Sequence, residues 1–371
     1  MALRSKTFLV ASALVCTACG PIAKLPSLPS AEVDTERHKE QVDQVRDYFA
    51  QRSRLDNVSF RIRVANRDDC KERTSAQIGL HAGTVASLPR KYRSFSHDAL
   101  SVSWTQATVL SIAETSPAGA AGIKPGDNLL TFNNQPVPRY RTARWIRAFV
   151  RDNGERPIQV LVRRDGVDKT HVVVPVRACA IPIELKTDSE VNAFTTDDEI
   201  VVHSSILRLA QTDAQLALVV GHELAHSNLG HLGKQRTNAI LGWAGGAAID
   251  AGILLGGVSS GGAFARQLTR AGAQAFNIAF EREADYVGAY YAARAGYELA
   301  GAEDFWRALS RENPDNLRIA TDHPVTPVRF VQMQKAAAEI ADKQRRGLPL
   351  NPEWKLEAGS EAEKIPQETI H

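Results

Sequence analysis

The feature that most constrains this chain is a short pattern at the end of an apolar segment. Residues 215–220 carry apolar side chains at helical spacing and run directly into Gly221-His222-Glu223-Leu224-Ala225-His226. Because positions four apart share one face of a helix, His222 and His226 can direct two imidazoles at one ion. The pattern therefore predicts two ligands of a metal site, and a third ligand must come from elsewhere in the chain.

A second segment offers that ligand. Phe280-Glu281-Arg282-Glu283-Ala284-Asp285 follows the first helix after a plausible crossover. Glu281 is the predicted third ligand, and Asp285, one turn further on, is predicted to accept the free N–H of a ligand histidine and fix its tautomer. Two histidines and one carboxylate leave a coordination position open, which is typical of catalytic zinc. We therefore predict one Zn²⁺ per chain, held by His222, His226 and Glu281.

The chemistry expected of this set is hydrolysis. A zinc ion lowers the pKa of a bound water to about 7. Glu223, one residue round the helix, is the predicted general base that takes the proton of this water and delivers it to the leaving amine. A third histidine ligand at the metzincin spacing is excluded, because positions 229 and 232 are leucine. His231 is therefore predicted to be a structural or rim residue.

Three motifs together carry a family resemblance: HELAH, EREAD, and Asp322-His323-Pro324 ahead of Arg329. They resemble the gluzincin zinc metallopeptidase family that includes HtpX, the CAAX prenyl endopeptidases and the periplasmic BepA-type proteases. The resemblance covers residues 58–64 and 180–344. It implies that His323 stabilises the oxyanion or caps the zinc, that Arg329 supports it, and that residues 191–194 form a strand beside the substrate. A histidine before proline can also be a plain loop residue.

A β-rich, Gly-punctuated block extends from about Ser75 to Val176. Its run from Ser116 to Asp127, SPAGAAGIKPGD, resembles the signature of PDZ domains of bacterial proteases. The resemblance implies strands at 108–112 and 129–132, a groove helix at 142–150, a hairpin of 158–162 with 171–174, and a carboxylate-binding loop at 78–80. A PDZ domain adds an extended peptide to an exposed sheet edge. The alternative is a β-rich spacer without a ligand.

The predicted fold class is α+β: a zincin-type metallopeptidase domain with an inserted β-rich PDZ-like domain. A helix is predicted over 36–52 and a half-buried strand over 58–64, where Val, Phe, Ile and Val alternate with polar residues. If that strand belongs with the chain after Cys179, the PDZ-like block is an insertion. The predicted boundaries are a signal peptide (1–18), a lipid-anchored linker (19–35), the metallopeptidase domain (36–70 and 179–345), the PDZ-like domain (71–178) and a flexible tail (346–371).

The N-terminus carries an export signal. Arg4 and Lys6 precede a short apolar run that is too short to span a bilayer, and Ala18-Cys19 ends it in the manner of a bacterial lipobox. Cys19 is therefore the predicted lipidation site, and the chain is expected in the periplasm, anchored to the outer membrane. Cys16 stands where such boxes usually carry leucine, so an ordinary secretory signal is the alternative.

Export also determines how the two remaining cysteines are interpreted. An oxidising compartment favours a Cys70–Cys179 disulfide, which closes a loop of roughly 110 residues. The alternative is two buried free thiols.

Lys and Arg number 45 against 42 Asp and Glu, and no basic stretch is interleaved with aromatics, so nucleic acid is not an expected partner.

Residues 239–264, rich in Gly, Ala, Ile and Leu, are predicted to form an apolar flap over the cleft or a segment that docks on membrane.

The function that the sequence favours is a zinc endopeptidase that hydrolyses misfolded envelope proteins, with the PDZ-like module recruiting or gating protein substrates. The alternative is a non-catalytic periplasmic chaperone or adaptor that binds peptides through the PDZ-like groove. The sequence indicates no particular oligomeric state.

Overall fold

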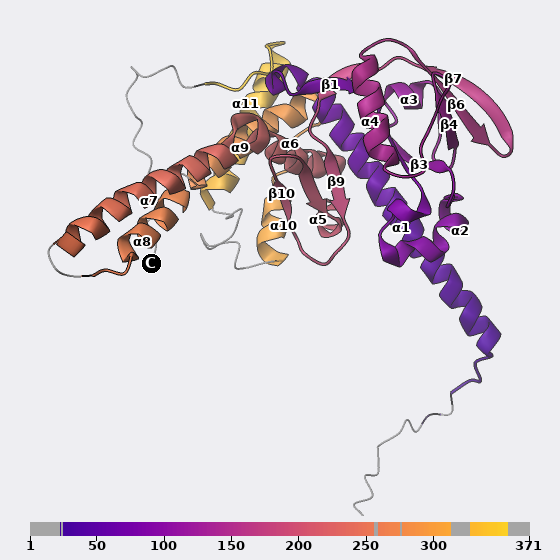
Figure 1. Cartoon of the computed structure of the whole chain (residues 1–371), viewed down its shortest axis with the longest axis horizontal. Coiled ribbons are helices and arrows are strands. Elements are labelled where there is room, and N and C mark those ends of the chain that lie inside the picture. The colour runs from indigo at the N-terminus through magenta and orange to yellow at the C-terminus, as the bar shows by residue number, and fades with distance from the viewer. Residues whose placement is uncertain (1–22, 24, 256–258, 275–276, 313–326, 355–371) are drawn as a thin grey trace, which may run out of the picture. The chain divides into compact units, whose positions relative to one another are not determined.

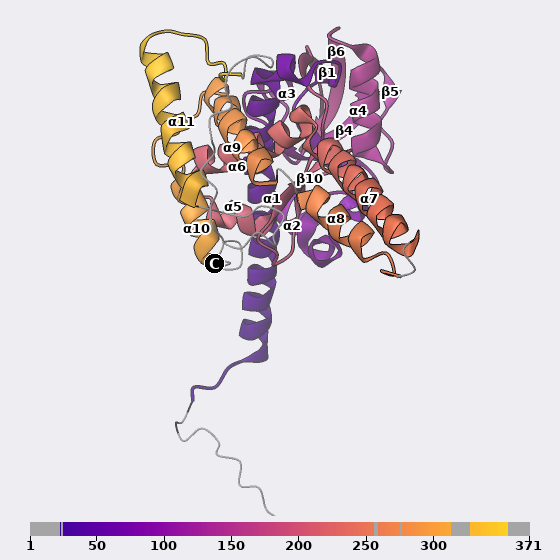
Figure 2. The same cartoon turned by 90° about the vertical axis from the view of Figure 1, so that its left-hand side faces the viewer.

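The structure is a computed structural model that describes residues 23, 25–255, 259–274, 277–312 and 327–354. Figures 1 and 2 show these elements in two views. The predicted signal peptide, Cys19 and His323 lie outside the described residues. The contacts divide the chain into two units, Met1–Gln41 and Val42–His371, and the second unit contains every element after helix α1.

Helix α1 runs unbroken from Ser30 to Ala65, so the predicted strand over 58–64 is wrong. Val58 and Ile62, four positions apart, enter one hydrophobic core, while Phe60 on another side of the helix is buried as well. A helix that is covered on more than one side buries neighbouring positions, and its apolar residues then imitate the two-residue alternation of a strand. The helix also begins within the predicted linker.

The chain after Cys179 is mainly helical. Together with helix α1 it makes up what we call the helical domain. Its strands form a small sheet in the order β10-β11-β9, with β10 antiparallel and β9 parallel to β11. The elements are β9 (Ile183–Lys186), β10 (Ala193–Thr195), β11 (Ile200–His203), α5 (Ser204–Leu209), α6 (Asp213–Leu229), α7 (His231–Leu255), α8 (Ala263–Gln274), α9 (Asn277–Arg294), α10 (Asp304–Glu312) and α11 (Pro327–Arg345).

The middle of the chain is the β-rich domain. Its main sheet has the order β2-β3-β4-β6-β7, with β5 paired to β4. The elements are β1 (Thr74–Gln77), β2 (Leu80–Gly83), α2 (Ser96–Leu100), β3 (Ala107–Ile112), α3 (Pro117–Ala120), β4 (Asn128–Phe132), β5 (Gln135–Pro136), α4 (Thr142–Asn153), β6 (Ile158–Arg164), β7 (Val167–Val173) and β8 (Val176–Cys179), with 3₁₀ turns η1 (Arg67–Cys70), η2 (Val85–Ser87) and η3 (Arg90–Phe95).

Local sequence explains the turns of this domain. The predicted hairpin is confirmed: β6 pairs with β7 around Asp165 and Gly166, which adopt φ values of 51° and 79°. Two consecutive positive φ values are what a two-residue hairpin requires, and Asp-Gly supplies them at low cost. Helix α3 begins after Ser116, whose hydroxyl accepts a hydrogen bond from the Gly119 amide, with Pro117 in the first turn.

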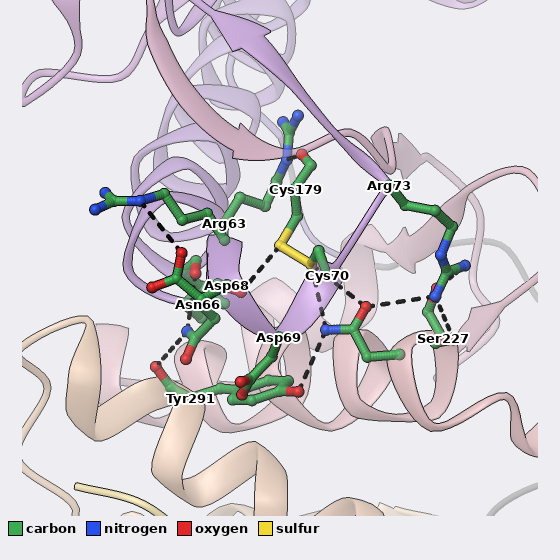
Figure 3. Close-up of a disulfide and its surroundings, with 12 residues drawn as sticks. Arg63, Asn66, Asp68, Asp69, Cys70, Arg73, Cys179, Ser227 and Tyr291 are labelled. Atoms are coloured by element: carbon green, nitrogen blue, oxygen red, sulfur yellow. Dashed lines mark hydrogen bonds and ion pairs between the residues drawn. A yellow bond between two sulfur atoms is a disulfide. The ribbon is translucent and has the colours of Figure 1, made fainter. Parts of the chain in front are cut away.

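The β-rich domain leaves and rejoins the chain at one neck, drawn in Figure 3. Strand β1 pairs with β8 so that Thr74 opposes Cys179. The predicted disulfide is confirmed: Cys70 is bonded to Cys179, with their Cα atoms 5.6 Å apart. Arg73 donates to the Ser227 carbonyl of α6 at 2.6 Å, which ties the neck to that helix. Both strands and the covalent bond therefore hold the two chain crossings together.

One hydrophobic core runs through the helical domain on both sides of this neck. Leu55, Val58 and Ile62 of α1 share it with Leu216 and Leu224 of α6. The β-rich domain has a separate core, built from its sheet and from α4. Because the chain contributes to the first core before and after the β-rich domain, that domain is an insertion, and the predicted α+β fold class is confirmed.

The segment 239–264, predicted as a flap or a membrane-docking segment, falls within α7 and the start of α8 in its described residues. Helices α7 and α8 lie side by side in Figures 1 and 2. Gly246 lets the two backbones meet, because a Cβ at this position would lie 2.4 Å from the Phe264 carbonyl oxygen. Among the described residues, α7 is long and apolar enough to cross a membrane, and only 6% of its most apolar window is buried. The predicted apolar segment thus lies mostly in α7 and reaches the start of α8.

Residues 350–353, shortly after the end of α11, pack on α9. The sequence had instead predicted a flexible tail over 346–371. Arg294 of α9 donates to the Leu350 carbonyl at 2.7 Å and to the Asn351 side chain at 2.9 Å. The Glu353 amide donates to the Tyr286 hydroxyl at 3.0 Å. Residues 350–353 therefore belong to the helical domain.

Candidate metal centre

Helix α6 carries the two histidines through the middle of the helical domain. The Thr212 hydroxyl caps its first turn by accepting a hydrogen bond from the Gln215 amide, and Gly230, with φ 67°, ends it. Every residue from 216 to 227 is buried. A helix that is covered all round must be apolar all round, so the few polar side chains in this stretch stand out as functional.

Helix α9 crosses α6 at two glycines. A Cβ at Gly221 would lie 2.5 Å from the Gly288 carbonyl oxygen, and a Cβ at Gly288 would lie 2.6 Å from the His222 amide nitrogen. Neither separation is tolerated between real atoms, so the crossing needs glycine on both helices. This close approach brings Glu281 and Asp285 of α9 within reach of the histidines.

The three predicted ligands converge. His222 Nε2 lies 3.0 Å from His226 Nε2 and 3.4 Å from Glu281 Oε2, and His226 Nε2 lies 3.2 Å from Glu281 Oε1. All three side chains are buried, and their donor atoms form a group that could hold a metal ion. The structure therefore brings together two nitrogens and one carboxylate as the sequence predicted.

These separations suit zinc. Metal–ligand bonds of about 2.0–2.1 Å in a tetrahedron place neighbouring donor atoms about 3.3 Å apart, close to the distances between His222, His226 and Glu281. Nitrogen and carboxylate ligands are also the kinds that zinc takes at catalytic sites. The donor set and its spacing thus fit the predicted ion, with His222, His226 and Glu281 as its protein ligands.

Asp285 and Arg329 support His222. Asp285 Oδ1 lies 3.0 Å from His222 Nδ1, on the side of the ring opposite Nε2. Burial lowers the pKa of His222, but the carboxylates of Asp285 and Glu281 outweigh it and raise this pKa to about 10. Burial alone would raise the pKa of Asp285, but Arg329 and His222 hold this pKa below its usual value. The surroundings of His222 therefore favour a positive charge at this point, which a metal ion would supply.

His226 has a different neighbour. His231 Nδ1 lies 3.0 Å from His226 Nδ1, and His231 Nε2 lies 3.1 Å from the Glu283 carboxylate. The His231 ring stacks on Phe280 at 4.7 Å between centroids. Burial lowers the pKa of His226 to about 4, so its imidazole is neutral near pH 7, the form that ligates metal. His231 thus lies beside the site in a supporting position, which agrees with the sequence prediction that it is not a ligand.

Glu223 accepts a hydrogen bond from a neighbouring strand. The Thr195 hydroxyl lies 2.8 Å from Glu223 Oε2 and 2.8 Å from the Glu223 carbonyl oxygen. Thr195 ends strand β10, which pairs only with β11 among the described strands. Strand β10 therefore lies next to the predicted base, and it overlaps the predicted strand at 191–194 in Ala193 and Phe194.

Sequence reasoning missed two contributors. Thr195 has no motif of its own, although it follows the segment that was predicted to lie beside the substrate. Gly288 is a single glycine inside a helix, and such a glycine signals a close helix contact only when its partner is known. The predicted Arg329 is placed against Asp285 and Glu281, with Nη1 3.1 Å from Glu281 Oε2. His323 is outside the described residues.

A second group of possible ligands lies elsewhere in the helical domain. Asp188, Glu190 and His203 offer donor atoms within 4.8 Å of one another. His203 Nδ1 lies 2.6 Å from Asp188 Oδ1, which is a hydrogen-bond distance, and Asp188 also pairs with Lys186 at 3.3 Å. Asp188 is thus already paired, whereas His203 Nε2 is buried and makes no hydrogen bond within the described part of the chain.

Comparison with known families assigns both domains. Residues 177–337 match peptidase family M48, and this stretch contains His222, Glu223, His226, Glu281 and Arg329. The chain carries a peptidase family M48 domain. The resemblance to a metallopeptidase family that the sequence predicted is confirmed over this stretch. Residues 63–174 match the PDZ domain, so the β-rich domain is a PDZ domain inserted before most of the M48 domain.

Similar curated proteins include beta-barrel assembly-enhancing proteases. That of Escherichia coli O157:H7 is 29% identical over 168 residues, which is 42% of this chain and 34% of the relative. That of Escherichia coli strain K12 is 28% identical over the same shares. That of Yersinia pestis is 30% identical over 139 residues, 35% of this chain and 28% of the relative. The chain thus spans about a third of the length of the relatives it matches.

Two solved structures are similar to the PDZ domain. One is the HtrA3 PDZ domain bound to a phage-derived ligand (FGRWV), with 21% identity and a TM-score of 0.22, covering 28% of this chain and 88% of that chain. The other is the HtrA-type protease AlgW with a decapeptide, with 19% identity and a TM-score of 0.22, covering 28% and 29%. Likeness at this level supports no conclusion about ligands.

Proposed function

We propose that this protein is a zinc-dependent endopeptidase that cleaves misfolded proteins of the bacterial envelope. The observation that carries the proposal is the convergence of His222, His226 and Glu281 at distances that suit one tetrahedral ion, next to Glu223. Similarity to beta-barrel assembly-enhancing proteases over part of their length supports the envelope setting. Export and anchoring through Cys19 are part of the proposal and rest on the sequence.

A bound zinc ion would polarise the scissile carbonyl and make water a nucleophile near pH 7. Glu223 accepts the proton of the attacking water and delivers it to the leaving amine. The hydrogen bond from Thr195 to Oε2 orients the Glu223 carboxylate for this transfer. Asp285, beside His222 Nδ1, would hold this ring in the tautomer that leaves Nε2 to ligate the ion.

Substrate binding would use the strand edge beside this site. An extended peptide can pair with the open edge of β10 and so lay its backbone along the groups that react. The PDZ domain would hold another part of the same client, which raises the local concentration of the cleavable segment. His323 is the proposed oxyanion donor, on the basis of the sequence motif alone.

Metal analysis combined with cleavage of a denatured envelope protein tests the proposal. The parent chain should bind one zinc and cleave the client, and removal of zinc by a chelator should stop cleavage. Glu223→Gln should retain one zinc while the rate falls at least about a hundredfold, because general acid–base catalysis typically contributes about 10²–10⁴.

Glu155→Gln is the matched control, because this exposed carboxylate lies on the PDZ domain. It should leave both zinc content and rate unchanged. A zinc-loaded parent that binds the denatured client without cutting it would instead establish the non-catalytic chaperone, and Glu223→Gln cutting as fast as the parent would refute the mechanism.

A further inference from the structure

Helix α10 carries a buried tryptophan that contacts the metal centre and that no sequence motif singled out. Phe305, Trp306 and Leu309 are the buried residues of this helix, and all three enter the core of the helical domain. Positions three and four apart share one face of a helix, so Leu309 packs on the same side as both aromatic rings. Trp306 also contacts two polar side chains of the site, so packing alone does not describe its role.

The first of these contacts is with Arg329. The Arg329 Cζ atom lies 4.9 Å from the centroid of the Trp306 ring, over its face. The carboxylates of Asp285 and Glu281 contact the edge of the same guanidinium. The N–H donors of a guanidinium lie in its plane, so an aromatic ring can cover one face without competing for a donor. The carboxylates and the indole together therefore enclose the buried cation.

The second contact is with His222. The centroids of the two rings are 5.5 Å apart and their planes form an angle of 60°, close to the edge-to-face arrangement that aromatic pairs favour. Asp285 Oδ1 lies 3.0 Å from Nδ1 of the same imidazole. A contact at one atom leaves a ring free to rock, and a packed neighbour removes that freedom. Trp306 thus contacts both ends of the series formed by His222, Asp285 and Arg329.

The burial of these groups gives the contacts their effect. Trp306 is 4% exposed, and Arg329 and Asp285 are each 1% exposed. Opposite charges attract more strongly where water is excluded, and the indole covers a face of the cation in this ion pair. The Trp306 Nε1 atom is buried and makes no hydrogen bond within the described residues. The contacts of Trp306 with the site are therefore those of its ring.

We propose that Trp306 is a positioning residue of the metal centre. Its ring holds Arg329 against the two carboxylates and thereby keeps His222 in the orientation that ligates the ion. Trp306 neither ligates the ion nor touches the reacting groups. The inference rests on the proposed function in one respect, that the three predicted ligands hold zinc. A tryptophan that only filled the core would add stability without changing the zinc affinity of the folded chain.

The zinc affinity of the folded full chain, measured by competition with a chromogenic chelator, tests the proposal. Trp306→Leu keeps an apolar side chain but removes the ring, and it should weaken zinc binding about tenfold, as loss of a partner that orients a metal ligand does. Trp306→Phe keeps a ring face and breaks no described hydrogen bond, so its affinity should stay within about threefold of the parent.

Phe305→Leu is the matched control, because it removes the neighbouring buried ring of the same helix. It should lower the urea midpoint, as truncation of a core side chain does, while zinc affinity stays within about twofold of the parent. Equal weakening of zinc binding by Trp306→Leu and Phe305→Leu would overturn the proposal.

A double substitution tests the route by which Trp306 acts. Asp285→Asn already breaks the series between Arg329 and His222, so addition of Trp306→Leu should weaken zinc binding by less than about threefold, because residues that act through one another are not additive. A further full tenfold loss would show that Trp306 acts independently of Asp285 and would contradict the proposal.

Tryptophan fluorescence supplies a readout that stability does not affect, and it decides the question should Trp306→Leu fail to fold. The chain has five tryptophans, and the Trp306 ring contacts the imidazole of a predicted ligand. Zinc titration should therefore change the emission of the parent, and Trp306→Phe should lose this change. Trp104→Phe, at an exposed position of the PDZ domain, should retain it. An undiminished change in Trp306→Phe would refute the inference.

Failure of the proposed function looks different from failure of this inference. A parent chain that takes up no zinc, or that binds zinc without cleaving a denatured client, would contradict the proposed function. A parent that binds zinc and cleaves, with Trp306→Leu no weaker in zinc binding than Phe305→Leu, would contradict the role of Trp306 alone.

Discussion

Arg329 holds both carboxylate oxygens of Asp285, with Nε 2.6 Å from Oδ2 and Nη2 2.8 Å from Oδ1. Its third nitrogen, Nη1, lies 3.1 Å from Glu281 Oε2. One guanidinium therefore contacts both Glu281, a predicted metal ligand, and Asp285, the partner of the predicted ligand His222. All three side chains are buried. A planar fork of donors suits this double contact, and a lysine would make only part of it.

Replacement of Arg329 should therefore destabilise the domain even without metal. Arg329→Met leaves Asp285 and Glu281 buried without their shared partner, and removal of one member of a buried ion pair typically costs about 3–5 kcal/mol. Urea unfolding of the zinc-free protein measures this loss. Arg329→Lys, which keeps the charge, should fall between the parent and Arg329→Met, and an unchanged midpoint in both variants would contradict the assigned contact.

Asp285→Asn should weaken zinc binding by the folded protein. Loss of the carboxylate removes the group that orients His222, and such changes typically reduce metal affinity about 10- to 100-fold. Competition with a chromogenic chelator gives the dissociation constant. Asp304→Asn, at an exposed helix position, is the control and should bind zinc as the parent does. Equal affinity in all three proteins would show that Asp285 does not orient the ligand.

Thr195→Val should lower kcat about tenfold with unchanged zinc content. The substitution keeps the shape of the side chain but removes the hydroxyl that donates to Glu223, so the base is less well oriented. Steady-state kinetics on an unfolded client check this result. Thr170→Val, at an exposed position of β7, is the matched control, and the prediction fails if the two variants have the same kcat.

Gly288→Ala should separate α6 from α9 and impair the metal site. The added Cβ would lie 2.6 Å from the His222 amide, and overpacking of this kind typically costs about 1–3 kcal/mol. Thermal unfolding and zinc titration should both show the loss. Gly245→Ala, in a helix position with open space around it, should be neutral or stabilising, because alanine favours helix by about 1 kcal/mol. The reverse order of the two variants would argue against the crossing.

Loss of the disulfide should weaken the fold without direct damage to the metal site. The bond joins residues 109 positions apart, and closure of a loop of this length contributes about 4–5 kcal/mol in the chain-entropy account. Cys70→Ser combined with Cys179→Ser should therefore lower the free energy of unfolding by up to this amount. Zinc affinity of the folded variant should stay within twofold of the parent, and a large loss of affinity would mean that the neck also shapes the site.

The parts of the site that follow from local spacing were predictable. His222 and His226 share a helix face by their positions alone, and two histidines with a carboxylate have a known preference for zinc. Thr195 and Gly288 were not predictable in the same way, because their roles depend on which strand and which helix lie beside α6. These are tertiary relationships that no short stretch of sequence encodes.

The error at α1 has a related cause. Val58, Phe60 and Ile62 alternate as in a strand, but Val58 and Ile62 enter the core of the helical domain, while Phe60 lines a cavity beside Ile78 of the β-rich domain. A helix that serves two domains loses the single apolar stripe by which helices are found in sequence. The PDZ elements were easier to predict, because their turn residues set local geometry directly.

The neck has a consequence for how such a chain can vary. Since Thr74 faces Cys179 across a two-stranded ladder, the polypeptide enters and leaves the PDZ domain at practically one place. Excision of that domain would require only a tight bridging turn, and the remaining protease would keep its path and its core. A different inserted domain could therefore take its place without rearrangement of the helical domain.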